Sequence, residues 1–170
     1  MAKPVSYERA LSDMGLALAS PPRPVATYIP AVLAGDLLFL SGVIPFRDGR
    51  LVMEGKLGRD LTVEQGYEAA KVSLLNALAI VKQELGTLDR VKKIVRMTGH
   101  VASAEGFVQQ PAVINGASDL LVKIFGEAGK HARVALGAAE LPLNAPIEIE
   151  LIVQVRPAGR SVDKKKKRLL

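Results

Sequence analysis

The sequence predicts a single α+β domain in which two long helices lie on one face of a mixed β-sheet. Three observations support this class. Apolar residues recur with helical spacing in two long segments and alternate with strand spacing in several others. The 170 residues suffice for one domain with a sizeable core, and they show no internal repeat or linker. With 49% hydrophobic residues, only 4% aromatic and no Trp, that core must be built from aliphatic side chains.

Residues 1–25 are expected to form a helical extension ahead of the main domain, which we place at residues 26–157. Ser6 can cap a helix, and apolar residues follow at helical spacing from Tyr7 to Leu18. Prolines at positions 21, 22 and 24 would end this helix.

Two short strands, Thr27–Leu33 and Leu37–Val43, are predicted next, on either side of a turn at Gly35. A second turn at Asp48-Gly49 would join Val43–Phe46 to the stretch Leu51–Met53.

The first long helix is predicted to open at Thr62, where Gln65 completes a capping box, and to stop at Gly86. A strand over Val91–Val101 follows. A second long helix begins at Pro111 and ends at Gly129.

Two strands, Ala132–Ala139 and Ile147–Val155, close the domain and carry the most informative side chains. By the strand period of two, Arg133 shares its face with only small residues such as Ala135 and Gly137. A guanidinium beside empty volume suits a carboxylate or phosphate, which it can bind through two parallel hydrogen bonds. A surface salt bridge from Arg133 to Glu148 or Glu150 explains the same pattern equally well.

Glu148 and Glu150 point to the same side of the last strand, about 7 Å apart along it. Repulsion between the two carboxylates can raise the pKa of one of them into a range useful for proton transfer. The alternative interpretation is the solvated outer face of a half-exposed strand.

Several chemistries are excluded or disfavoured. The absence of Cys excludes disulfides, thiolate nucleophiles and Cys-based metal sites. His100 and His131 lie 31 positions apart with no metal-binding spacing, so we expect no metal site. We take both histidines to be ordinary residues rather than catalytic ones. No apolar run approaches the roughly 20 residues that span a bilayer. We therefore expect a cytosolic protein with no membrane partner.

The net charge of +6 is concentrated at the C-terminus. Lys164–Lys167 and Arg168 supply five of these charges, which leaves the remainder close to neutral. We expect residues 158–170 to be a disordered basic tail rather than a nucleic-acid site, because no aromatic residue lies among them to stack on bases.

Together these residues resemble a known family. The run His-Ala-Arg-Val-Ala-Leu-Gly-Ala-Ala-Glu-Leu-Pro at residues 131–142, with Ile-Glu-Ile-Glu at 147–150, is similar to the C-terminal signature of the RidA/YjgF proteins. These are the reactive-intermediate deaminases, which also carry endoribonuclease labels. Residues 34–45, which contain Ser-Gly-Val-Ile-Pro, resemble the family's opening hairpin, and Asn115 falls where the family keeps an asparagine. The resemblance covers about residues 26–155.

The resemblance implies a chorismate-mutase-like fold that assembles as a homotrimer, with a pocket between each pair of subunits. It further implies hydrolysis of 2-imino or 2-enamino acids to 2-oxo acids and ammonia, with no metal or organic cofactor. Arg133 would clamp the carboxylate of a small substrate and Glu148 would position or activate water. Tyr28, Ser41, Asn115 and the backbone of Ala135 would line the pocket.

The chain departs from the family pattern in ways that mark a divergent branch. Val134-Ala135 stands where deaminase-active members usually carry Ser-Cys or a similar polar pair, and Val43 replaces a common Gln. Two other functions are therefore kept beside the deaminase: a non-catalytic binder or regulator of small carboxylates, and, less favoured, a protein that acts on RNA.

Overall fold

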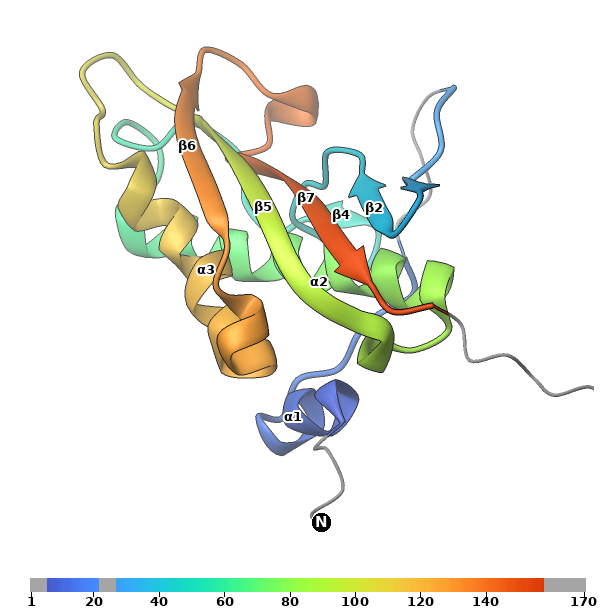
Figure 1. The fold of residues 1–170 in the computed structure, drawn as a ribbon. Coiled ribbons are helices and arrows are strands. Elements are labelled where there is room, and N and C mark those ends of the chain that lie inside the picture. The colour runs from blue at the N-terminus through green and yellow to red at the C-terminus, as the bar shows by residue number, and fades with distance from the viewer. Residues whose placement is uncertain (1–5, 22–26, 158–170) are drawn as a thin grey trace, which may run out of the picture.

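The computed structural model describes residues 6–21 and 27–157. Within them the main sheet has the strand order β1-β2-β7-β5-β6, and α2 and α3 lie together on one of its faces (Figure 1). Only β5 and β6 run parallel; the other neighbouring strands are antiparallel. The predicted α+β fold, a mixed sheet with two long helices on one face, is confirmed.

The larger elements are α1 (Tyr7–Asp13), β1 (Ala31–Ala34), β2 (Leu37–Leu40), β3 (Phe46–Arg47), β4 (Arg50–Leu51), α2 (Val63–Leu85), β5 (Val91–Ala102), α3 (Gln110–Phe125), β6 (Ala132–Ala138) and β7 (Ile147–Val155). Three short 3-10 helices, η1 (Leu88–Arg90), η2 (Gly126–Gly129) and η3 (Pro142–Asn144), connect some of them.

The N-terminal helix is shorter than predicted. It ends at Asp13, because Gly15 takes a left-handed φ of 68° and its N–H bonds to the carbonyl of Ser12. The N–H of Leu16 then bonds back to the carbonyl of Leu11, which completes a Schellman stop. The hydroxyl of Ser6 donates to Glu8 rather than accepting from the helix backbone. The prolines at 22 and 24 and the basic tail lie outside the described residues.

The first two strands are also shorter than predicted, at four residues each. After Leu40 the chain leaves the regular ladder, but Ser41 still bonds to the segment before β1: its N–H donates to the carbonyl of Pro30 and its hydroxyl to that of Ile29, at 2.9 and 2.8 Å. Val43 rejoins the sheet through an isolated bridge to Ile149. The turn at Asp48-Gly49 forms as predicted, with both residues at positive φ, and joins β3 to β4.

The two long helices begin close to where the sequence placed them. Thr62 and Gln65 form the predicted capping box of α2, and Gly86 ends that helix in a left-handed conformation. Helix α3 begins at Gln110, one residue before Pro111, but ends at Phe125 instead of Gly129. Gly126, at φ 58° and ψ −129°, breaks it, and residues 126–129 form η2.

The core is an aliphatic layer between the sheet and the two helices. Its largest fully buried side chains include Leu38, Leu74, Leu78, Ile94, Met97, Ile114, Leu121, Ile149 and Leu151. The side-chain hydroxyl of Ser73 on α2 lies in this layer without a hydrogen-bond partner. In the described part of the chain, no helix has the length and apolar character needed to cross a membrane.

Candidate functional site

Arg133 lies on the helix-covered face of the sheet. Its register partner on β5 is Met97, whose own partner on β7 is the buried Leu151, so all three side chains lie on the same side. Because β6 is the last strand of the sheet, Arg133 stands at an open edge. The small neighbours expected on its face are present, with Ala135 and Gly137 in the same alternation.

Hydrogen bonds from helix α3 hold the guanidinium of Arg133. Its Nη1 donates to Oδ1 of Asn115 at 2.8 Å and to Oγ of Ser118 at 2.9 Å. Its Nη2 lies 3.5 Å from the backbone carbonyl oxygen of Pro111. No Asp or Glu within residues 6–21 and 27–157 forms an ion pair with Arg133. One edge of the guanidinium is therefore anchored, while the Nε–Nη2 edge keeps donors for a ligand.

Close backbone packing sets the rotation of α3 that brings Asn115 and Ser118 to Arg133. A Cβ atom on Gly116 would overlap the backbone carbonyl of Tyr67 on α2. A Cβ on Gly99 of β5 would come within 2.6 Å of the Ile114 side chain. Both positions need glycine for the helix to approach so closely, and that approach turns the polar side of α3 toward β6.

Glu148 lies on the opposite face of the sheet, which the helices leave open. Its register partner is His100, and that residue pairs in turn with Leu136 on β6. A Cβ atom added to Gly42 would overlap Oε1 of Glu148 and lie 2.7 Å from its carboxyl carbon. The carboxylate therefore rests directly on the backbone of Gly42, next to Ser41.

Burial raises the pKa of the Glu148 carboxyl above its usual value. Nearby His100 lowers this pKa and the negative charge of Glu150 raises it, both by less than burial does. The sequence-based expectation of a raised pKa has the right direction. Its main cause is desolvation by the chain around Gly42, with repulsion from Glu150 as a smaller contribution.

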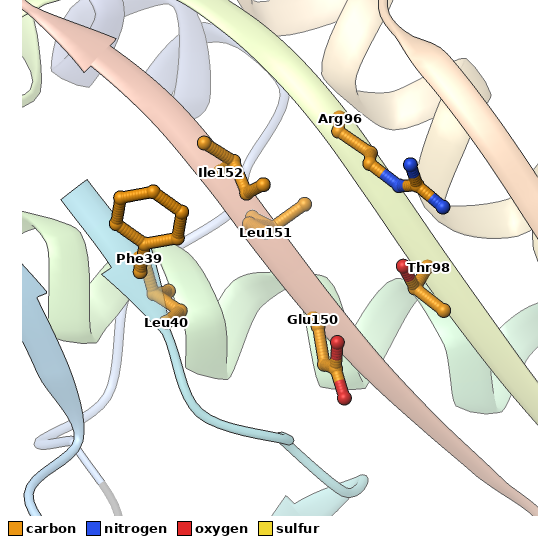
Figure 2. Close-up of a pocket in the computed structure, with 7 residues that line it drawn as sticks. All are labelled: Phe39, Leu40, Arg96, Thr98, Glu150, Leu151 and Ile152. Atoms are coloured by element: carbon orange, nitrogen blue, oxygen red, sulfur yellow. The ribbon is translucent and has the colours of Figure 1, made fainter. Parts of the chain in front are cut away.

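A shallow hollow of about 310 Å³ lies on the same open face, with Glu150 but not Glu148 among its lining residues. Figure 2 shows Phe39 and Ile152 along one side of it, with Arg96, Thr98 and Glu150 on the other. His100 approaches Glu150 at 3.7 Å between Nε2 and Oε1. The open face thus mixes charged and apolar side chains, unlike a fully solvated sheet surface.

The residues singled out from the sequence fall into two separate groups. Arg133, Asn115 and Ala135 gather at the β6 edge. Glu148 lies with Ser41 on the open face, and Ser41 is tied to Ile29, the neighbour of Tyr28. The proposed salt bridge from Arg133 to Glu148 or Glu150 is wrong, because strand pairing places the arginine and the two carboxylates on opposite faces.

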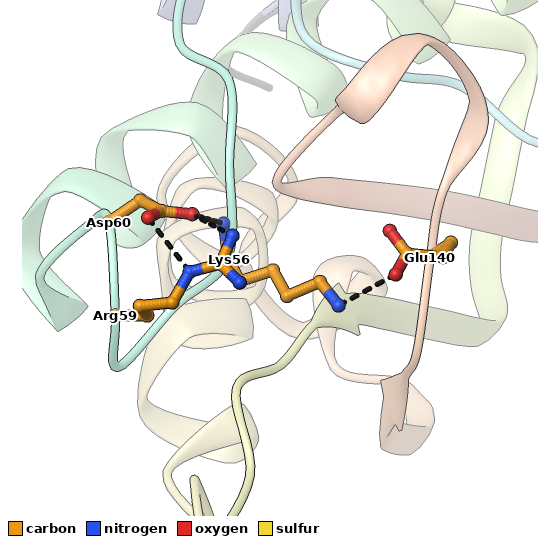
Figure 3. Close-up of polar contacts among 4 residues, drawn as sticks. All are labelled: Lys56, Arg59, Asp60 and Glu140. Atoms are coloured by element: carbon orange, nitrogen blue, oxygen red, sulfur yellow. Dashed lines mark hydrogen bonds and ion pairs between the residues drawn. The ribbon is translucent and has the colours of Figure 1, made fainter.

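A network of ion pairs holds the loop before α2 against the segment that leads into β7. Lys56 Nζ meets Glu140 at 2.7 Å, and Arg59 meets Asp60 at 2.8 Å (Figure 3). Hydrogen bonds from Arg59 and from the backbone N–H of Lys56 lower the pKa of Asp60 to about 2. The Lys56–Glu140 pair thus connects the segment that precedes β7, the strand of Glu148, to the loop that precedes α2.

Sequence reasoning missed three residues in or beside these groups: Gly42, Ser118 and His131, whose Nε2 lies 3.1 Å from Oγ of Ser118. Ser118 follows Asn115 by three positions and so shares its helix face, and His131 precedes Arg133 by two and shares its strand face. Those spacings were the available signal. Nothing in the sequence pairs Gly42 with Glu148, since 106 positions of chain separate them. In the described residues, no group of three His, Asp or Glu side chains is arranged to hold a metal ion.

The fold and these two groups define a chorismate-mutase-like α+β protein with an anchored arginine at one sheet edge and a half-buried carboxylate on the opposite face. The family model described as "YjgF/chorismate mutase-like, putative endoribonuclease" matches residues 8–155. The chain belongs to the YjgF/RidA family.

Individual proteins are similar to this chain over most of its length. Protein TCP17 of Trypanosoma cruzi is 39% identical over 146 residues, covering 85% of this chain and 91% of that protein. The crystal structure of Atu1372 from Agrobacterium tumefaciens is 40% identical in sequence and has a TM-score of 0.83. The match covers 88% of this chain and 92% of Atu1372. The crystal structure of a protein from Shewanella oneidensis described as a "putative endoribonuclease" is 37% identical, with a TM-score of 0.86. That match covers 88% of this chain and 99% of the Shewanella protein.

The raised pKa of Glu148 makes a prediction about stability. Because the pKa of Glu148 is higher in the folded than in the unfolded protein, ionisation of this carboxyl destabilises the folded state. The free energy of unfolding therefore falls as the pH rises through the raised pKa. Glu148→Gln does not ionise. We expect its free energy of unfolding to exceed that of the wild type at pH 7, and the difference to shrink at pH 4.

Urea denaturation at fixed protein concentration measures both values. The exposed Glu105→Gln controls for the loss of one negative charge. A Glu148→Gln variant that is less stable than the wild type at pH 7 would contradict the assigned cause.

Proposed function

We propose that this protein is a hydrolytic deaminase that converts reactive 2-imino and 2-enamino acids to 2-oxo acids and ammonia. The observation that carries the proposal is the anchored guanidinium of Arg133. Asn115 and Ser118 occupy its Nη1, and the Nε–Nη2 edge presents two parallel donors. This edge matches the two oxygens of a small carboxylate.

Glu148 supplies the second requirement of the reaction, a proton-transfer group, and burial raises the pKa of its carboxyl above the usual value. In the proposed step, Glu148 takes a proton from water as the water oxygen bonds to the imine carbon. That proton then passes to nitrogen, which completes the carbinolamine. The hydroxyl proton of the carbinolamine moves to nitrogen in turn, the carbon–nitrogen bond breaks as the carbon–oxygen double bond forms, and ammonia leaves with a 2-oxo acid. The imine carbon is already electrophilic, so orientation and proton transfer suffice and no cofactor is invoked.

Arg133 and Glu148 can act on one substrate only if a second copy of the chain completes the pocket. We propose the homotrimer that the family resemblance implies, in which the β6 edge of one subunit meets the open face of the next. Asn115 and Ala135 would then line the pocket from one side, and Tyr28 and Ser41 from the other. Exposed apolar side chains on the open face favour such a contact: Phe39 is 40% exposed and Leu136 is 51% exposed.

The second candidate function is a non-catalytic binder of small carboxylates, which Val134-Ala135 favours. Arg133 would hold a 2-oxo acid in the same way. Turnover would be absent because Val134-Ala135 replaces the Ser-Cys or similar polar pair that is usual in deaminase-active members. An RNA-directed function has less support, because the chain outside the basic tail is close to neutral and no aromatic residue lies in the tail to stack on bases. A cytosolic location stays a prediction.

Replacing Arg133 with Ala should abolish deamination. We expect kcat/KM for freshly generated 2-aminoacrylate or 2-iminobutyrate to fall about 100-fold or more, because the carboxylate loses a bidentate, charge-assisted partner. Ammonia release measures this. A wild-type protein that does not accelerate hydrolysis over buffer would contradict the deaminase. Stabilisation by 2-oxo acids in a thermal-shift assay that Arg133→Ala removes, without turnover, would select the binder.

A mixture of two inactive variants should recover activity. Arg133→Ala keeps an intact open face and Glu148→Gln keeps an intact β6 edge. In randomly mixed trimers, about a quarter of the pockets would combine the two intact groups. Co-expression and the ammonia assay test this, with separately purified variants mixed without subunit exchange as the control. Failure to recover activity in trimers shown by mass to be mixed would contradict a pocket shared between subunits.

Gly42→Ala should separate activity from stability. The added methyl must displace the flexible end of Glu148, not backbone, so we expect little change in the melting temperature. We expect kcat to fall about 10-fold or more because the proton-transfer group is misplaced. Gly35→Ala, where a Cβ meets nothing within 4 Å but φ is 62°, provides the opposite control: it strains the backbone and leaves Glu148 in place.

A further inference from the structure

The hydrogen bonds that anchor Arg133 continue behind it to His131. Oγ of Ser118, which accepts from Arg133 Nη1, lies 3.1 Å from Nε2 of His131. Nδ1 of the same ring lies 2.7 Å from the carbonyl oxygen of Gly129. This series of hydrogen bonds therefore runs from Gly129 of η2 to His131, just before β6, then to Ser118 of α3 and on to the Arg133 guanidinium.

For a neutral His131 ring, the direction of every hydrogen bond in this series is determined. A carbonyl oxygen can only accept, so Nδ1 of His131 carries the proton and donates to Gly129. In the neutral ring Nε2 is then an acceptor, and the Ser118 hydroxyl donates to it. The lone pairs of the Ser118 oxygen are thereby turned toward Arg133, which can only donate.

The surroundings of His131 favour this neutral ring. Burial is the largest effect on the pKa of His131 and lowers it. The Gly129 hydrogen bond raises this pKa by less than burial lowers it, and the positive charge of Arg133 adds a still smaller lowering. Of the charged side chains on η2 and beside it, Lys130 and Glu127 pair with each other at 2.6 Å and extend into solvent. An imidazolium would turn Nε2 into a donor and remove the acceptor that orients Ser118.

Close packing fixes the far end of this series. A Cβ on Gly129 would lie 2.7 Å from the carbonyl carbon of Leu121 and 3.0 Å from the backbone nitrogen of Val122. These are helix backbone atoms that cannot move aside cheaply. Gly129 therefore lets η2 lie against α3, and its carbonyl becomes a fixed acceptor for His131.

We propose that His131 and Ser118 are positioning residues that fix the guanidinium of Arg133 so that its Nε–Nη2 edge receives the ligand carboxylate. The ligand role of Arg133 rests on the proposed function, whereas the positioning does not. Neither residue touches the reacting atoms. The Ser118 hydroxyl, oriented by His131, holds Nη1 of Arg133 before any ligand binds. The arginine side chain therefore loses less conformational entropy when it binds a carboxylate.

The first test uses the full-length protein without ligand. The sequence has only two histidines, so ¹⁵N spectra contain two sets of ring signals, and His131→Gln assigns them. At pH 7.5 we expect His131 to show a protonated Nδ1 and an unprotonated Nε2. We also expect slow rotation of the Arg133 guanidinium, which Ser118→Ala makes fast. An Nε2–H tautomer, or guanidinium rotation unchanged in Ser118→Ala, would overturn the proposal.

The second test measures binding of pyruvate, a stable 2-oxo acid, by calorimetry. We expect Ser118→Ala and His131→Phe to weaken binding about tenfold, because each removes the oriented acceptor behind Nη1. His131→Gln can keep an acceptor toward Ser118 and should stay within about threefold of the wild type. Ser73→Ala, a buried serine without a hydrogen-bond partner, is the matched control for loss of a hydroxyl. Wild-type affinity in folded Ser118→Ala would overturn the proposal.

The two tests separate this inference from the proposed function. If the wild-type protein binds no pyruvate and releases no ammonia, the proposed function fails, and the ligand-free spectra still decide whether His131 and Ser118 fix Arg133. If the spectra show the opposite tautomer while Arg133→Ala abolishes deamination, the positioning fails and the deaminase stands.

Discussion

Strand β5 is hydrogen-bonded to β6 on one side and to β7 on the other, and these two ladders fix the faces on which Arg133 and Glu148 lie. Arg133 pairs with Met97, whose side chain lies on the helix-covered face, and Glu148 pairs with His100, whose side chain lies on the open face. Because side chains alternate strictly along each strand, no rotamer change can bring the arginine and the glutamate of one chain together. A chemistry that uses both must therefore be built between copies.

Small residues control how closely the second layer approaches this sheet. Gly99, Gly116 and Gly129 stand where a methyl group would collide with a neighbouring helix or strand. Their absence of side chain lets α3 lie against α2 and the sheet, with its polar side turned toward the β6 edge. The anchoring of Arg133 by Asn115 and Ser118 thus follows from core packing as much as from the polar residues themselves.

Local features of the chain were predictable and tertiary ones were not. The capping box at Thr62 and the alternation in β7 depend on neighbouring residues, so the sequence located both elements closely. Helix α1 ends at Asp13 because Gly15 adopts a positive φ well before the prolines. Helix α3 ends at Phe125 because Gly126, rather than Gly129, adopts a positive φ. Arg133, Asn115 and Glu148 could be named from the family pattern. Their division between two faces required the strand register, which no single segment encodes.

The placement of the two groups on opposite faces couples function to the amount of protein. In the proposed assembly an isolated chain holds every required side chain and yet no complete pocket. The fraction of competent pockets then follows mass action, rising with concentration until the trimer is saturated. Dilution would lower the activity of each molecule as well as the number of molecules, so synthesis of the chain would act as a nonlinear control on its output.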